Sequence, residues 1–143
     1  MPSAHVARRT FLATAAAGLY TTTSAAASPL GPIRIGQIGV GHAHASKLSV
    51  YRNNPDYEVV GIVEPDEQLR KAAQERDPYR DLKWMTREEL LNTPGLQAVL
   101  VETPVRDLLD HAAVCVAAGK HIHIDKPAGQ SLPQFAEIGR AHV

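Results

Sequence analysis

Strand-type and helix-type segments alternate along most of this sequence, and this alternation is the feature that most constrains its fold. The strand-type segments are apolar and rich in β-branched residues, at 33–39, 57–63, 97–101 and 121–125, with a weaker one near Trp84. The helix-type segments lie between them, at 43–51, after Asp66, at 86–93 and at 105–118. Alternating elements with short connections predict an α/β fold of the Rossmann type, a doubly wound parallel sheet with right-handed crossovers.

The composition narrows the possible functions. The 143 residues are enough for one domain, and 15 Lys and Arg residues against 15 Asp and Glu residues give no electrostatic basis for binding nucleic acid. Cys115 is the only cysteine, which excludes an internal disulfide framework and a cysteine-rich zinc site. On a helix-type segment, Cys115 is expected to be a packed small residue rather than a nucleophile.

The N-terminal residues 1–27 have the pattern of a twin-arginine export signal. The sequence Arg8-Arg9-Thr10-Phe11-Leu12 precedes an alanine-rich apolar stretch, and small residues end at Ala27. We expect cleavage after Ala27, a linker at 28–32, and a periplasmic or exported protein with no membrane attachment after cleavage. The alternative is an alanine-rich N-terminus in which the arginine pair arises by chance.

The C-terminal residues 137–143 are predicted to be a non-native tail. Their sequence, EIGRAHV, can be encoded by the beginning of a widely used sequencing adapter. The predicted Rossmann domain then covers residues 33–136. The alternative is a natural helix that continues from Leu132, and the codons of the gene decide between the two.

A glycine pair, Gly39-Val40-Gly41, lies where the first strand-type segment meets the first helix. In a dinucleotide fold the first glycine makes the tight turn, and the second lets the backbone approach a pyrophosphate that helix N-terminal amides bind. His42 follows directly, and His44 stands at the third position of the usual glycine motif. These residues are candidates for cofactor binding; the alternative is a structural turn.

Glu64 lies at the end of the second strand-type segment, about 25 residues after Gly39. A carboxylate at this point binds ribose hydroxyls and repels a 2′-phosphate, so the sequence favours NAD over NADP. The alternative is a solvated glutamate with no ligand.

The segment 119–128 places Asp125 and Lys126 at the carboxyl end of the last strand-type segment. Ligands of open α/β sheets bind at that edge. A lysine there can hold a substrate hydroxyl or assist the transfer of its proton. A lysine after a strand is more commonly a solvent-exposed residue without such a role.

The motifs Gly39-Val40-Gly41, Glu64-Pro65-Asp66, Glu102-Thr103-Pro104 and Asp125-Lys126-Pro127 together resemble the glucose–fructose oxidoreductase/inositol dehydrogenase (Gfo/Idh/MocA) family over about 33–135. The resemblance implies an NAD(P)-binding Rossmann domain followed by a C-terminal substrate domain that is missing here. It also implies that Lys126 is catalytic beside the nicotinamide and that Asp125 and Lys126 are among the cofactor-binding residues. Thr103 and Pro104 then form the turn beneath the cofactor, and Asp125 replaces the usual glutamate. Glu102 has no role implied.

The resulting prediction is a truncated, NAD-dependent oxidoreductase fragment. In the intact enzyme, which is expected to be a homo-oligomer, hydride would pass between nicotinamide and a sugar- or polyol-type substrate. This chain alone is expected to be inactive. An NAD-dependent glycosidase and an inactive nucleotide-binding fragment remain alternatives.

The histidines suggest a further alternative, a metal-dependent hydrolase. His42-x-His44 and His121-x-His123-x-Asp125 contain residue types that zinc prefers. Strand alternation offers a simpler explanation, in which Ile122 and Ile124 face one layer and the histidines face the other. The sequence therefore predicts no metal site.

Overall fold

The computed structural model describes residues 31–140. The predicted export signal at 1–27 and most of the predicted linker lie outside the described residues. Within 31–140, no helix is long and apolar enough to span a bilayer.

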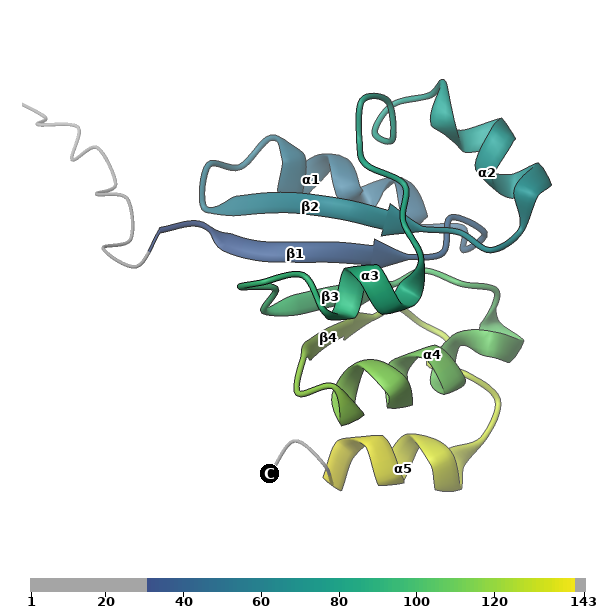
Figure 1. The fold of residues 1–143 in the computed structure, drawn as a ribbon. Helices are drawn as coiled ribbons and strands as arrows, with labels where there is room; N and C mark the ends of the chain where they lie inside the picture. Colours follow the sequence, from purple (N-terminus) through teal and green to yellow (C-terminus); the bar gives the residue numbers. More distant parts are fainter. Residues whose placement is uncertain (1–30, 141–143) are drawn as a thin grey trace, which may run out of the picture.

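Within residues 31–140, four strands form one parallel sheet in the order β2-β1-β3-β4 (Figure 1). The strands are β1 (Ile33–Ile38), β2 (Tyr57–Val63), β3 (Ala98–Val101) and β4 (His121–Ile124). The helices are the 3-10 turn η1 (Ala45–Lys47), α1 (Leu48–Arg52), α2 (Glu67–Gln74), α3 (Arg87–Leu91), α4 (Val105–Ala117) and α5 (Leu132–Arg140). The predicted α/β parallel sheet of the Rossmann type is confirmed.

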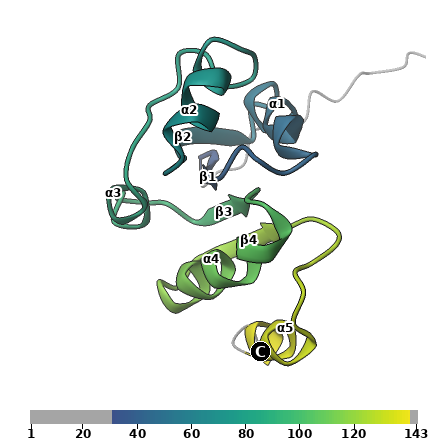
Figure 2. The same cartoon turned by 90° about the vertical axis from the view of Figure 1, so that its right-hand side faces the viewer.

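Helices cover both faces of the sheet (Figure 2). On one face, Leu90 of α3 and Leu108 of α4 pack with Val99 of β3 in the larger core cluster. On the other face, Leu48 of α1 packs with Ile62 of β2. The two faces therefore have separate apolar cores, as expected for a doubly wound sheet, in which strands are covered on both sides.

Cys115 of α4 is fully buried in the larger core cluster. Burial raises the pKa of its thiol to about 11, which disfavours the reactive thiolate. The prediction that Cys115 is a packed residue is confirmed.

Helix starts follow the capping residues in the sequence. The Asp66 carboxylate accepts the backbone N–H groups of Gln68 and Leu69 at 2.8 and 3.0 Å, which fixes the start of α2. Thr86 and Glu89 form a reciprocal capping box at α3. The weaker strand near Trp84 is reduced to a single bridge with Ile62.

The first helix differs from the prediction of one helix over 43–51. It begins as the 3-10 turn η1 at Ala45 and becomes α-helical only at Leu48. The N–H of His42 donates to the Glu102 carbonyl at 2.9 Å. This bond ties the preceding loop to the end of β3, so the helix starts later than its composition suggests.

The predicted domain end at residue 136 lies inside helix α5, and no element ends there. Helix α5 runs through 137–140, and Ile138 is buried in the cluster that α4 covers. The non-native origin of 137–143 stays a prediction, and residues 141–143 lie outside the described residues.

Candidate dinucleotide-binding site

The glycine turn lies against the residues that follow β3. Gly39 has a φ of +90°, and a Cβ there would lie 2.6 Å from the Thr103 nitrogen and 2.7 Å from the Glu102 carbonyl oxygen. A Cβ on Gly41 would lie 3.3 Å from the Pro104 ring. Only glycine fits the first position, both for its backbone conformation and for its space. The structure thus brings together Gly39, Gly41, Thr103 and Pro104, as the sequence predicts.

Glu64 connects this turn to the start of α2. One carboxylate oxygen accepts the Val40 N–H at 2.9 Å, and the other accepts the Asp66 N–H at 2.9 Å. The Gly39 N–H donates to the Val63 carbonyl at 2.8 Å, so β1 and β2 end side by side. Glu64 is half-buried and held by two backbone donors, unlike a freely solvated side chain.

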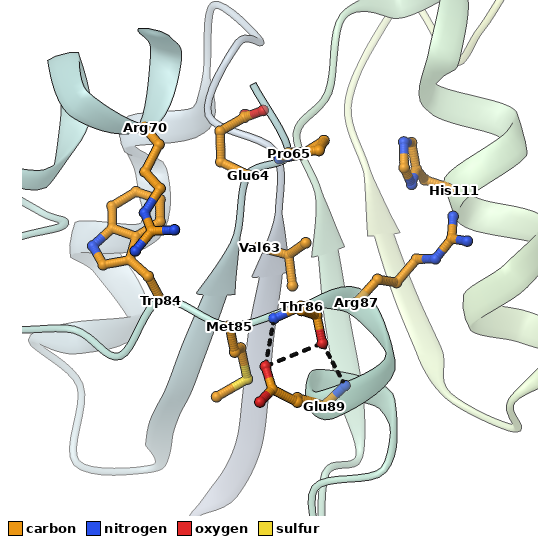
Figure 3. Close-up of a pocket in the computed structure, with 10 residues that line it drawn as sticks. All are labelled: Val63, Glu64, Pro65, Arg70, Trp84, Met85, Thr86, Arg87, Glu89 and His111. Atoms are coloured by element: carbon orange, nitrogen blue, oxygen red, sulfur yellow. Dashed lines mark hydrogen bonds between the residues drawn. The ribbon is translucent and has the colours of Figure 1, made fainter. Parts of the chain in front are cut away.

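A cavity of about 650 Å³ opens beside Glu64 (Figure 3). Its walls come from the end of β2, from α2, from the start of α3 and the segment before it, and from α4. They include Glu64, Arg70, Trp84, Arg87 and His111. Its volume is within the range of small-molecule sites. The Arg70 guanidinium lies 5.7 Å from the centre of the Trp84 ring, within the range of a cation–π contact.

His111 is a cavity residue that the sequence does not single out. It is half-buried, and its Nδ1 makes no hydrogen bond within the described chain. Burial, with a smaller contribution from Arg87, lowers the pKa of His111, so its imidazole is neutral at physiological pH. Its helical spacing gave no indication of a cavity, because the segment 84–89 reaches it only in the folded chain.

The far edge of the sheet carries the other predicted residues. Asp125 lies just after β4, and its carboxylate accepts a hydrogen bond from the Lys47 ammonium. It also accepts one from the backbone N–H of Lys126, at 2.7 Å. The hydrogen bond from Lys47 is the main reason why the pKa of Asp125 is held well below its usual range, and the Lys126 N–H adds to the effect. The Lys126 residue itself is exposed.

Lys47 also contacts two further side chains, His123 and Glu102. Its ammonium lies 3.3 Å from His123 Nε2 and 3.8 Å from the nearer oxygen of Glu102. The Tyr51 hydroxyl lies 3.0 Å from His123 Nδ1. The predicted alternation is confirmed, because His123 faces α1 whereas Ile122 packs with the core under α4. Lys47 and Tyr51 are not recognisable as site residues from the sequence, although their i, i+4 spacing places them on one helical face.

Glu102 is fully buried between the glycine turn and this cluster. Its Oε2 lies 3.1 Å from His42 Nδ1. Burial raises the pKa of the Glu102 carboxyl, and Lys47 and His42 oppose that effect.

The sequence model of an oxidoreductase family with an NAD-binding Rossmann fold, GFO_IDH_MocA, matches residues 33–142. The chain belongs to the Gfo/Idh/MocA oxidoreductase family. A curated relative, scyllo-inositol 2-dehydrogenase (NADP(+)) IolW of Bacillus subtilis, is 33% identical over 54 residues, which is 38% of this chain and 15% of the relative. The family membership that the sequence motifs predict is therefore confirmed.

Two solved structures illustrate the fold of this Gfo/Idh/MocA chain. KijD10, a 3-ketoreductase from Actinomadura kijaniata in complex with TDP-benzene and NADP, is 26% identical with a TM-score of 0.64; the match covers 78% of this chain and 35% of KijD10. GenD2 from gentamicin A biosynthesis, in complex with NAD, is 21% identical with a TM-score of 0.67, over 78% of this chain and 31% of GenD2. The chain spans about a third of the solved structures that it matches.

The shared part of these proteins is the NAD(P)-binding Rossmann domain. This chain therefore has the NAD(P)-binding Rossmann fold of its oxidoreductase family. The positive φ and close backbone packing of Gly39 form the tight turn of a dinucleotide fold, and Glu64 is held at the end of β2, so the residues present fit the cofactor.

Proposed function

We propose that this chain is the NAD-binding part of an oxidoreductase that transfers a hydride between nicotinamide and a sugar- or polyol-type substrate. The family supports the redox chemistry, and the inositol dehydrogenase relative supports a polyol-type substrate. The backbone around Gly39 and Gly41 binds the pyrophosphate, with His42 and His44 bordering it. Bound nicotinamide supplies the hydride acceptor or donor.

The observation that carries the choice of NAD is the position of Glu64. Its carboxylate is fixed at the end of β2 by two backbone N–H groups and lines the cavity. A carboxylate has about four acceptor positions, so two are left for ribose hydroxyls. A 2′-phosphate would meet this negative charge at short range, and the repulsion favours NAD.

NADP is the second candidate because Arg70 and Arg87 line the same cavity. Guanidinium groups are the preferred partners of phosphate. Arg70 already lies over the Trp84 ring. The repulsion from Glu64 is expected to outweigh the attraction of both arginines, because a fixed carboxylate cannot move away from a 2′-phosphate.

Lys126 is proposed to act on the substrate. Its backbone N–H is held by Asp125, which fixes the point where its exposed side chain leaves β4. From there the ammonium holds the reacting hydroxyl and assists the movement of its proton. Asp125 acts as a positioning residue.

The experiment uses the full-length enzyme, obtained with its downstream domain, and candidate polyols and sugars. Lys126→Met is expected to lower kcat by roughly 100-fold or more and to leave the Kd for NAD unchanged. If Lys126→Met had the same kcat as the unaltered enzyme with a substrate that the enzyme oxidises, Lys126 would have no catalytic role. Hydrolysis of a glycoside with no net NADH formation would instead support the NAD-dependent glycosidase.

Export by the twin-arginine route is also proposed, from the pattern at 1–27. Because that route carries folded proteins, the intact enzyme would cross with its cofactor bound and would exchange it slowly. Residues 1–27 fused to a reporter should direct it out of the cytoplasm, and R8K/R9K should retain it there. Equal export of both fusions would contradict the proposal.

A further inference from the structure

Three side chains of the types that bind metals converge at the carboxyl ends of β1 and β4. His42, His44 and Asp125 each offer one ligand atom, and these atoms all lie within 4.8 Å of one another. The two histidines follow β1 and the aspartate follows β4, so only the folded sheet brings them together. Two imidazoles and a carboxylate suit Zn²⁺ and other divalent first-row cations.

The contacts among these side chains leave buried polar atoms without hydrogen bonds. His44 Nδ1 lies 2.8 Å from an Asp125 carboxylate oxygen, yet it is buried and makes no hydrogen bond within the described residues. Oε1 of the fully buried Glu102 also makes no hydrogen bond in that part of the chain, and the Lys47 ammonium lies 3.8 Å from it. Buried polar atoms rarely lack partners, and leaving them so is costly. A cation between His44 and Asp125 would supply the missing partner.

Glu102 has the position of an outer carboxylate. His42 Nδ1 lies 3.1 Å from Glu102 Oε2, so a hydrogen on Nδ1 points to the carboxylate and Nε2 is the ring nitrogen left for a metal. A carboxylate against the non-ligating nitrogen is the usual companion of a metal-bound histidine, because it fixes the ring orientation. Glu102, to which the sequence assigns no role, would thus orient the His42 ring for metal binding.

Lys47 is the cation that the cluster already contains. Its ammonium contacts the same Asp125 oxygen that faces His44. His44, Lys47 and Asp125 also line an open hollow of about 440 Å³, which gives ions from solvent a path to the cluster. We propose that His42, His44 and Asp125 form a binding site for a divalent first-row cation, with Lys47 as its competitor for Asp125. The site leaves a coordination position for water or a substrate oxygen, and it does not depend on a bound dinucleotide.

The test uses the 143-residue chain without dinucleotide, with Zn²⁺ as the probe in competition with a fluorescent chelator. The chain is expected to bind Zn²⁺ at a single tight site. His44→Ala, at a half-exposed position that tolerates truncation, should weaken binding by about 100-fold or more, since loss of an outer-shell partner alone costs 10–100-fold. His111→Gln, in the separate cavity, is the matched control and should bind as the unaltered chain does.

A second pair of variants tests the competition. Lys47→Met should strengthen Zn²⁺ binding by about tenfold, because it frees Asp125 and removes a like charge. Lys71→Met removes an exposed lysine that pairs with Glu67 and should leave binding unchanged. An unchanged affinity in Lys47→Met would overturn the competition.

Absence of Zn²⁺ binding by the unaltered chain would overturn the site itself, as would an undiminished affinity in both His44→Ala and Asp125→Asn. Circular dichroism of each variant separates loss of binding from loss of fold. With Co²⁺ in place of Zn²⁺, the visible bands of nitrogen and oxygen coordination should appear in the unaltered chain and vanish in His44→Ala.

Discussion

Two carboxylates at opposite edges of the sheet are held in different ways. Glu64, after β2, accepts two backbone N–H groups, from Val40 and Asp66. Asp125, after β4, accepts one backbone N–H and the ammonium of Lys47. Main-chain donors cannot leave while the fold persists, whereas a lysine side chain can swing away. The carboxylate at the β2 edge is therefore fixed in place, whereas the charges at the β4 edge can be rearranged.

The largest expected effect comes from breaking the backbone framework of the β2 edge. Gly39→Ala should lower the free energy of unfolding by about 3 kcal/mol or more, because a positive φ and a clash with the backbone of Thr103 combine there. Gly119→Ala is the control, since Gly119 has a φ of +70° with nothing within 4 Å of a Cβ. It should cost about 1 kcal/mol. Denaturant unfolding measures both, and equal losses would contradict the close approach at Gly39.

Removing the anchored carboxylate should have the next largest effect. Glu64→Ala should weaken NAD binding by about tenfold, the loss of a charge-assisted hydrogen bond to ribose. The same change should leave NADP binding equal or tighter, because it removes a repulsive charge. Glu67→Ala, on the exposed surface of α2, should leave both affinities unchanged. Parallel losses for NAD and NADP would show that Glu64 supports the turn without reading the ribose.

A smaller effect is expected from the cap that Glu64 supports. Asp66→Ala removes the acceptor for two N–H groups at the start of α2 and should cost about 1 kcal/mol of unfolding free energy. Thermal unfolding should show a melting temperature lower by several degrees. A melting temperature equal to that of the unaltered chain would mean that water replaces the cap without loss.

The pH dependence of stability should distinguish Asp125, at the β4 edge, from Glu102, at the end of β3. Because the pKa of Asp125 is lowered by folding, its stabilisation is present above the ordinary aspartate pKa and is lost as pH falls toward the folded value. Asp125→Asn should therefore lower the melting temperature by a few degrees at pH 7 and by less near pH 3. A deficit that does not change with pH would contradict the ion pair with Lys47.

Glu102→Gln should show the opposite dependence. Burial raises the pKa of Glu102, so its ionisation costs stability as pH rises above the ordinary glutamate value. The melting temperature of the variant, relative to the unaltered chain, should rise between acid and neutral pH. A relative fall over that range would mean that Lys47 and His42 outweigh burial.

The β2 edge could be predicted from the sequence because its parts are local. Gly39, Glu64 and Asp66 are recognisable from a turn, a strand end and a helix cap, and the backbone geometry that joins them follows from a parallel β-α-β unit. The helix predicted from residue 86 also begins there, with Thr86 as its capping residue. The delayed start of α1 was missed, because a bond from His42 to the end of β3 determines it.

The β4 edge could be predicted only in part. The positions of Asp125 and Lys126 at the strand end follow from the pattern, and so does the direction of His123. The meeting of Lys47 with Asp125, and of His42 with Glu102, joins segments that are far apart in the chain. Side-chain contacts of that kind depend on the order of strands in the sheet, which the alternation of elements does not specify.

Titration of the unaltered chain with NAD and with NADP tests the central claim most directly, with the fluorescence of Trp84 as the readout. Trp84 is the only tryptophan, and it lines the cavity beside Glu64. The account predicts saturable quenching by NAD, with an affinity at least about tenfold higher than for NADP, as expected for one repulsive charge at the ribose. Tighter binding of NADP, or no response to either nucleotide in a folded chain, would contradict it.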